Sequence, residues 1–355
     1  LTSEISTFLR FFLMIDIKGK ELTSADKKIL CEPNVGGIIL FSRNYESLKQ
    51  ITELVDEIRE LKSPSLLIAV DHEGGRVQRF HDAFTLIPPM RQIGRIYDIK
   101  KDEALDLSRK IGWLIGSELR SIGIDLSFSP CVDLDWGLSS VIGDRSFHQN
   151  KFVVESLSYE YSKGMLSSGM SPVAKHFPGH GAVTTDSHLD LPIDRRDFSA
   201  LLDDIYPYEC LARKRVMPAI MMSHVIFSEA DNYPASISNY WIKDHLRKQI
   251  NYNGVVFCDD LTMKALDKYG GSSECAMKAL KAGCDMLLVC NDRENAKKII
   301  HSTKNYNNYT SMARLASIVG KKSYTNDELV RSEKWIEARS SLEKLNLNPE
   351  FELEI

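Results

Sequence analysis

The chain has 355 residues and a near-balanced charge, and these two properties exclude several classes of protein. Hydrophobic residues make up 43% and charged residues 26%, close to a globular average, so disorder is excluded as the main state. The 45 lysines and arginines against 49 aspartates and glutamates give a net charge of −4. The chain therefore lacks the excess positive charge that is typical of proteins that bind nucleic acid or an anionic membrane surface. No apolar run approaches the ~18 residues of a membrane span.

The N-terminal apolar run and the cysteines both bear on the compartment. Phe8–Ile15 is apolar, but Arg10 interrupts it and Asp16 follows without a small-residue cleavage site, so we interpret it as a first strand and not as a signal peptide. The seven cysteines are odd in number and no pair forms a CxxC motif. This usage is typical of reduced thiols, and we expect a cytoplasmic protein.

Eight short apolar runs recur along the chain, each nearly continuous in Val, Ile, Leu and Phe. Strands that are buried on both faces, as parallel strands covered by helices are, show this composition. The runs are Phe11–Ile17, Val35–Phe41, Leu66–Asp71, Ile124–Pro130, Pro172–Phe177, Ala219–Val225, Val255–Asp260 and Asp285–Cys290.

The segments between these runs carry a helical period. One apolar face runs from Leu48 to Leu61 with Ser47 as the N-cap, and another runs from Leu105 to Leu119 and stops at Gly123. Similar segments span 152–166, 200–212 and 241–250. Eight strands that alternate with helices predict an α/β fold, a single-domain (β/α)8 TIM-type barrel over residues 1–290. An open doubly wound sheet stays an alternative, although no GxGxxG motif follows any strand. Residues 291–355 are helical in period and polar, and we expect them to pack on the barrel as a C-terminal extension.

Charged and polar side chains collect where the predicted strands end, and in a barrel these ends meet on one rim. The third strand runs into Asp71-His72-Glu73-Gly74-Gly75-Arg76, with Arg79 beyond, and Arg145 follows the fourth. The fifth contains Lys175-His176, the sixth is followed by His224, and the seventh ends in Asp259-Asp260. Strand alternation places Asp259 and Asp260 on opposite faces, so one aspartate is expected to face a ligand.

Each of these residues also has an ordinary structural interpretation. Asp71 and Asp259 suit helix caps, Lys175 suits an ion pair, and Arg145 suits a loop charge. His72 and Glu73, beside two glycines, suit a turn, and His224 suits a core position. Helix capping, however, does not need lysine, arginine and several histidines on one rim. Together they indicate a shared polar cavity.

The segment 175–190 after the fifth strand is the most specific feature. Pro178, Gly179 and Gly181 suit tight backbone geometry. Asp186 and His188 are two residues apart, so in an extended stretch both point the same way. A carboxylate beside an imidazole fixes its tautomer and raises its basicity, which suits proton transfer.

With these motifs the sequence resembles the bacterial β-N-acetylhexosaminidases of glycoside hydrolase family 3. The matching segments lie between about Gly36 and Met263. They are Gly37–Tyr45, Val70–Arg79, Val141–Phe147, Lys175–Gly181 with Asp186–His188, and Asp259–Met263. One departure is Cys258, where serine is expected before the nucleophile.

The resemblance implies a retaining enzyme that removes terminal β-linked N-acetylglucosamine (GlcNAc), with muropeptides of GlcNAc on anhydro-N-acetylmuramic acid as substrates in peptidoglycan recycling. It implies that Asp259 is the nucleophile and that His188, paired with Asp186, is the acid/base. Asp71, Arg79, Arg145, Lys175 and His176 would hold the sugar hydroxyls. It implies no cofactor, no metal and no nucleic-acid or membrane partner, and we expect a monomer.

Three other functions stay open at this point. The same residues suit a glycoside phosphorylase, because a neutral histidine repels a phosphate acceptor less than a carboxylate does. His176, His180, His188, His224 and Asp259 could form the ligand set of a metal-dependent barrel hydrolase. A sugar-binding protein without turnover is the third, although binding alone does not need the Asp259/His188 pair.

Overall fold

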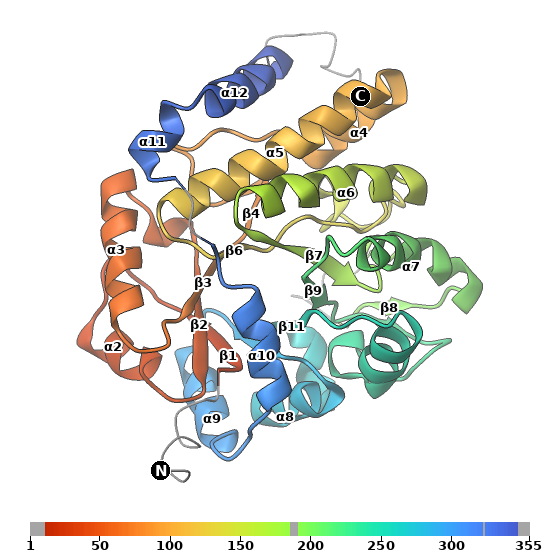
Figure 1. Ribbon diagram of the computed structural model, residues 1–355. Helices are drawn as coiled ribbons and strands as arrows, with labels where there is room; N and C mark the ends of the chain where they lie inside the picture. The colour runs from red at the N-terminus through yellow and green to blue at the C-terminus, as the bar shows by residue number, and fades with distance from the viewer. Residues whose placement is uncertain (1–10, 185–190, 322–323, 347–355) are drawn as a thin grey trace.

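The structure is a computed structural model that describes residues 11–184, 191–321 and 324–346. Eight parallel strands close into a barrel in the order β1-β12-β11-β9-β7-β6-β3-β2 (Figure 1). Each of them overlaps one predicted strand, so the predicted (β/α)8 barrel is confirmed and the open-sheet alternative is wrong. The strands are β1 (Leu13–Asp16), β2 (Val35–Leu40), β3 (Leu67–Val70), β6 (Leu126–Ser127), β7 (Ser171–Phe177), β9 (Ala219–Met222), β11 (Val255–Asp260) and β12 (Met286–Val289).

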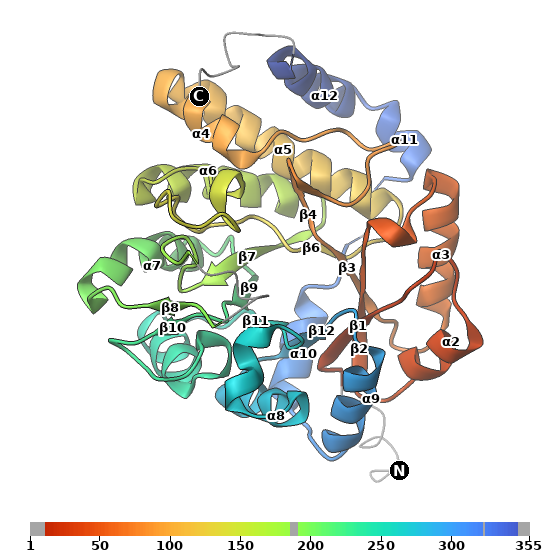
Figure 2. The same cartoon turned by 180° about the vertical axis from the view of Figure 1, so that it is seen from behind.

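Helices surround the barrel on its outer face (Figures 1 and 2). They are α2 (Ser24–Leu30), α3 (Leu48–Glu60), α4 (Met90–Ile99), α5 (Lys101–Ser121), α6 (Lys151–Ser167), α7 (Phe198–Arg213), α8 (Ser272–Ala282) and α9 (Arg293–Ser302). The predicted helix at 241–250 is instead a π-helix, η4 (Tyr240–Gln249). Two small sheets lie outside the barrel and were not predicted: β4 (His72–Gly74) with β5 (Val77–Gln78), and β8 (Ile193–Asp194) with β10 (Ile226–Phe227).

Helix α3 shows how the local sequence forms these elements. The Ser47 side chain accepts a hydrogen bond from the Gln50 backbone N–H, which is the N-cap that the sequence predicts. The helix buries Ile51, Leu54, Val55 and Ile58, which are spaced by one, three or four residues and share one face, against the barrel. No helix of the described residues has the length and apolar character needed to cross a membrane.

The apolar core has an inner and an outer part. The inner part fills the barrel with side chains such as Met14, Phe128, Met221 and Phe257, and the outer part lies between the strands and the helices. Helix α10 (Tyr309–Ser317) lies across one end of the barrel (Figure 1), and its Leu315 belongs to the inner core. This end is closed by packing, so a ligand site has to form at the other end, where the strands finish.

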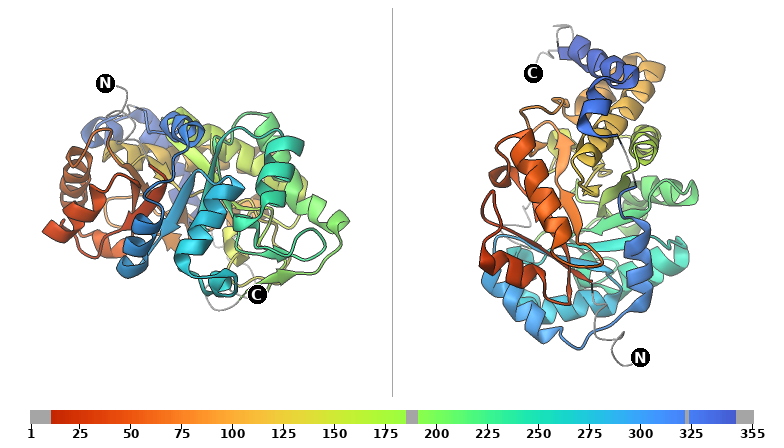
Figure 3. Two further views of the ribbon diagram at one scale, coloured as in Figure 1. Left: turned by 90° about the horizontal axis from the view of Figure 1, so that it is seen from below. Right: turned by 60° about the vertical axis from the view of Figure 1, so that its left-hand side comes forward.

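Buried carboxylates tie the C-terminal segment to the closed end. Asp285 accepts hydrogen bonds from Arg247, Ser311 and Arg314. Trp335, in α12 (Glu333–Asn346), donates to Glu118 of α5 at 2.8 Å. The helices α11 (Asn326–Val330) and α12 accordingly lie beside α5 (Figure 3). The division of the chain after Cys290 stays a prediction.

Candidate active site

A pocket of about 280 Å³ lies at the carboxyl ends of the barrel strands. This volume is at the small end of the ~300–1,000 Å³ typical of ligand pockets, so it suits one small molecule. Its apolar floor includes Ile39, Met221 and Leu288. Its charged and imidazole lining consists of Asp71, Glu73, Arg79, Arg145, Lys175, His176, His180, Asp259 and Asp260.

A buried ion-pair network forms one wall of the pocket. Arg145 donates to both oxygens of Glu73, from Nε at 2.9 Å and from Nη2 at 2.8 Å. Lys175 Nζ lies 2.5 Å from Glu73 Oε1 and 2.8 Å from Asp71 Oδ1. The Lys175 and Glu73 side chains are only 3% and 4% exposed, so each charge depends on its partners and not on water.

The network sets the charge of each of its members. Burial opposes ionisation of Glu73, but Arg145 and Lys175 outweigh it and hold the pKa of Glu73 well below its usual value. Burial likewise opposes the charge of Lys175, and Asp71 and Glu73 raise the pKa of Lys175 above its usual value. The wall therefore presents fixed charges, which can orient hydroxyl groups without rearranging.

Glu73→Gln is expected to destabilise the protein by about 3–5 kcal/mol at pH 7, because two buried cations lose their shared anion. The pKa of Glu73 is lowered in the folded state, so its contribution is complete above the unfolded-state value of ~4.3 and is lost as the pH falls. The stability difference between wild type and Glu73→Gln should therefore shrink on acidification. Urea unfolding at pH 7 and pH 4 measures it.

Glu46→Gln is the matched control, because Glu46 pairs with Lys20 at 2.8 Å on the surface, where its side chain is 63% exposed. This change should leave the unfolding midpoint almost unaltered at both pH values. A Glu73→Gln protein as stable as Glu46→Gln would contradict the assignment of the wall as a charge-dependent network.

Two strand irregularities turn consecutive residues of β11 and β7 toward the pocket. Asp259 and Asp260 both line it, with a register shift in β11 between Cys258 and Asp260. Lys175 and His176 both line it, with a similar shift in β7 between Lys175 and Phe177. The prediction that the two aspartates lie on opposite faces is therefore wrong, because a regular strand pleat does not persist here. That a single aspartate faces the ligand stays a prediction.

The two aspartates nevertheless differ in their hydrogen bonds. Asp260 accepts from the Thr262 and Cys290 backbone N–H groups at 3.1 and 3.0 Å and from the Thr262 hydroxyl at 2.8 Å. Asp259 Oδ1 accepts from the Asp260 N–H at 2.8 Å, and within the described residues its second oxygen has no protein donor. Asp259 therefore keeps an oxygen for a ligand, while Asp260 supports the backbone.

Their pKa values also move apart. Burial raises the pKa of Asp260 to about 6, with a further rise from Asp259, although hydrogen bonds from Thr262 and Cys290 act against it. Burial acts the same way on Asp259, but His224, His176 and the Asp260 N–H outweigh it and hold the pKa of Asp259 below its usual value. Asp259 is thus the ionised member of the pair in mildly acidic solution, as a nucleophile requires.

The structure brings together six of the eight residues expected in the site. Asp71, Arg79, Arg145, Lys175, His176 and Asp259 all line the pocket, and their individual roles stay predictions. Arg79 Nη2 lies 3.8 Å from Asp71 Oδ2, and its guanidinium lies over the Phe41 ring at 5.7 Å. Asp186 and His188 lie outside the described residues. Cys258 is buried in the outer core and does not line the pocket.

Of the ligand set considered for a metal-dependent hydrolase, His176, His180 and Asp259 line the pocket, and His188 lies outside the described residues. His224 is buried behind the pocket, where its ring contacts the Ser236 hydroxyl at 2.6 Å and the Asp260 carbonyl at 2.9 Å. The cluster of metal-capable groups found among the described residues is a different one, Cys131, Asp133 and His176.

Two residues of the site were missed by reasoning from the sequence. The turn interpretation suits Gly74 and Gly75, but Glu73 beside them is the central anion of the pocket wall. Asp133 binds His176 and follows the fourth strand by a few residues within the apolar stretch Cys131–Leu134. A charge in an apolar run just after a strand was the signal for Asp133, and it is the rule that singled out Asp71.

The fold and the pocket together define a (β/α)8-barrel enzyme that acts on a small polar molecule, and comparison with known proteins specifies the class. The model of the glycosyl hydrolase family 3 N-terminal domain matches residues 13–320. A β-hexosaminidase of Thioalkalivibrio sulfidiphilus is 45% identical over 343 residues, which are 97% of this chain and 99% of that protein.

Solved structures agree with this assignment. NagZ from Neisseria gonorrhoeae, in complex with N-trifluoroacetyl-D-glucosamine, superposes with a TM-score of 0.89 at 39% identity, over 95% of this chain and 98% of that one. A family 3 β-N-acetylglucosaminidase from Paenibacillus superposes with a TM-score of 0.84 at 30% identity, over 94% and 67% of the two chains. The chain therefore belongs to glycosyl hydrolase family 3 and, within it, to the β-hexosaminidases.

Proposed function

We propose that this pocket hydrolyses terminal β-linked GlcNAc with retention of configuration, and that the substrates are GlcNAc–anhydro-N-acetylmuramic acid muropeptides of peptidoglycan recycling. The observation that carries the proposal is the convergence of Asp259, with an oxygen left for a ligand, and the Asp71–Glu73–Arg145–Lys175 wall in one small pocket. The Neisseria relative that binds a trifluoroacetylated glucosamine supports an amino sugar as the ligand.

The shape of the site supports exo action. The barrel is filled by its inner core and closed at its far end, so the pocket is a dead end and not a channel. A terminal sugar can enter such a pocket, whereas an internal sugar needs space on both sides. The leaving group then remains near the rim, outside the ion-pair wall.

The proposed reaction has two steps. An oxygen of Asp259 attacks the anomeric carbon while His188 gives a proton to the departing glycosidic oxygen, which leaves a glycosyl-aspartate. His188, oriented by Asp186, then takes a proton from water as the water attacks the same carbon. This step releases GlcNAc in the β-configuration and restores the Asp259 carboxylate.

The compartment is also part of the proposal. All seven cysteines are free thiols in the structure, and six of them are buried. Reduced cysteines are typical of the cytoplasm, and we place the enzyme there.

The first test compares an aryl β-GlcNAc with the matching aryl β-glucoside. We expect kcat/KM to favour the GlcNAc compound by at least about 100-fold, because a site that hydrogen-bonds a substituent discriminates strongly against its absence. A preference for the plain glucoside would contradict the proposal. The products are analysed in the same assay at millimolar phosphate, and GlcNAc-phosphate in excess over free GlcNAc would identify a phosphorylase instead.

A further inference from the structure

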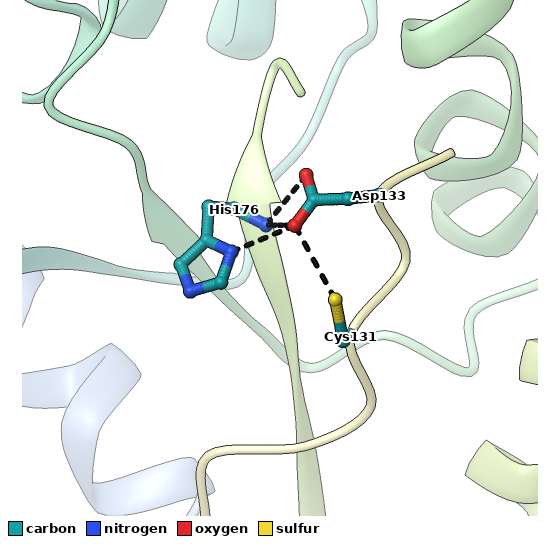
Figure 4. Close-up of side chains that lie close together, drawn as sticks. All are labelled: Cys131, Asp133 and His176. Carbon is teal, nitrogen blue, oxygen red and sulfur yellow. Dashed lines mark hydrogen bonds and ion pairs between the residues drawn. The ribbon is translucent and has the colours of Figure 1, made fainter. Parts of the chain in front are cut away.

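A buried aspartate–histidine pair lies beside the pocket, separate from the expected Asp186/His188 pair. Asp133 follows β6, and His176 is in β7 (Figure 4). His176 Nδ1 lies 2.7 Å from Asp133 Oδ2. The other ring nitrogen, Nε2, points away from Asp133, and His176 lines the pocket.

The Asp133 carboxylate is surrounded by hydrogen-bond donors. It accepts from the His176 backbone N–H at 3.2 Å, from the His180 N–H at 2.8 Å and from the Cys131 thiol at 3.3 Å, in addition to the His176 ring. Burial opposes its ionisation, but His176 and His180 outweigh burial and hold the pKa of Asp133 below its usual value. An ionised Asp133 can only accept, so Nδ1 of His176 carries a proton, and whenever the ring is neutral Nε2 is left as an acceptor.

Asp133 and its neighbour Leu134 also contact the segment of chain that follows β7. The Asp133 Oδ1 atom accepts from the His180 N–H, and Gly181 packs against the Leu134 carbonyl so closely that a Cβ atom there would lie 1.8 Å from the oxygen. The segments 131–134 and 176–181 are thus fixed to each other through Asp133 and this contact.

We propose that Asp133 is a positioning residue for sugar recognition, which holds His176 in the Nδ1–H tautomer so that Nε2 accepts a hydrogen bond from a sugar hydroxyl. The inference rests on the proposed function, in which His176 binds the sugar. It adds a second aspartate–histidine pair, whose task is recognition and not proton transfer.

The same cluster could instead be considered as a metal site, because one ligand atom each of Cys131, Asp133 and His176 lies within 4.8 Å of the others. Zinc would require a thiolate and a free lone pair on Nδ1. Burial and Asp133 raise the pKa of Cys131 well above its usual value, so the thiol keeps its proton and donates it. The protonation states therefore favour a hydrogen-bond network.

A double-mutant cycle on the full chain tests the proposal, with an aryl β-GlcNAc as substrate. Asp133→Asn keeps the shape but removes the charge that fixes the tautomer, and we expect kcat/KM to fall about 10–100-fold, as is usual for such supporting partners. His176→Ala should cost at least as much. In the His176→Ala background, Asp133→Asn should cost less than about threefold more, because its partner is already gone.

Several outcomes would overturn the inference, and the variants separate failure of the role of Asp133 from failure of the proposed function. Full activity of His176→Ala would refute the role of His176 in sugar binding, which belongs to the proposed function. A strong loss in His176→Ala with wild-type activity in Asp133→Asn, or additive losses in the double variant, would refute the role of Asp133. The role of His176 in sugar binding would then still stand.

Two further measurements do not depend on the folding of Asp133→Asn. The ¹⁵N chemical shifts of the His176 ring in the wild-type protein, assigned by their disappearance in His176→Ala, should show the Nδ1–H tautomer, and an Nε2–H tautomer would overturn the proposal.

Cys131→Val keeps the packing and the Asp133–His176 pair, so its kcat/KM should stay within about threefold of wild type, because a thiol is a weak donor. Stoichiometric zinc with chelator-sensitive activity would make the cluster a metal site and would also overturn it.

Discussion

Replacing Asp259 by Asn is expected to lower kcat for an aryl β-GlcNAc by roughly 10⁴- to 10⁶-fold, because the amide cannot form the glycosyl-enzyme. The fold should persist, since Asn can still accept the hydrogen bond that Asp259 receives from the Asp260 N–H. Steady-state kinetics and thermal unfolding of the same preparation measure both effects.

Asp260→Asn is the matched control, one residue along the same strand. Asp260 accepts three hydrogen bonds from Thr262 and Cys290, so its loss should lower stability and reduce activity only through the altered backbone. If Asp260→Asn were inactive and Asp259→Asn retained turnover, the two aspartates would have to exchange their assigned roles.

Replacing His188 by Ala is expected to give the second large effect, because general acid/base assistance is worth about 10²–10⁴-fold. An aryl leaving group hardly needs protonation, so the glycosyl-enzyme should still form. The second step has lost the base that activates water, so this intermediate should accumulate and give a burst of aryl product. Azide, which needs no base, should restore turnover and give the β-glycosyl azide.

Asp186→Asn is the graded control, since it misorients the imidazole without removing it and should show the same behaviour more weakly. Wild-type deglycosylation in His188→Ala, or no response to azide, would assign the acid/base role to another residue. Because both residues lie outside the described part of the chain, this kinetic experiment carries the assignment.

The architecture could be predicted from the sequence because buried strands have a distinct pattern of apolar residues. Each barrel strand is covered on both faces, so its apolar residues are continuous, as in Val35–Leu40 and Val255–Cys258. Closure of the sheet was not readable, because it depends on the pairing of β1 with β12, which are far apart in the chain. The filling of the closed end by Leu315 was likewise hidden, because this residue lies in a polar stretch of the C-terminal segment.

The site residues that lie at the ends of predicted strands could be identified from the sequence. Asp71 and Lys175 were found in this way, whereas strand alternation failed at Asp260, where the register of β11 shifts. Glu73 was missed because its partners come from distant parts of the chain, Arg145 from the short helix η2 (Gly143–Arg145) and Lys175 from β7, and no local pattern shows that three such charges meet. The sequence therefore identifies candidate residues, and the structure shows which of them pair.

The most direct test of the proposed chemistry is mass spectrometry of the enzyme after incubation with a slow fluorinated β-GlcNAc donor. We expect one covalent sugar per chain, on the peptide that contains Asp259 and at that side chain. The Asp259→Asn protein should remain unlabelled under the same conditions. A label on Asp260 or Glu73, or slow turnover by the wild-type enzyme with inversion at the anomeric carbon, would contradict the account.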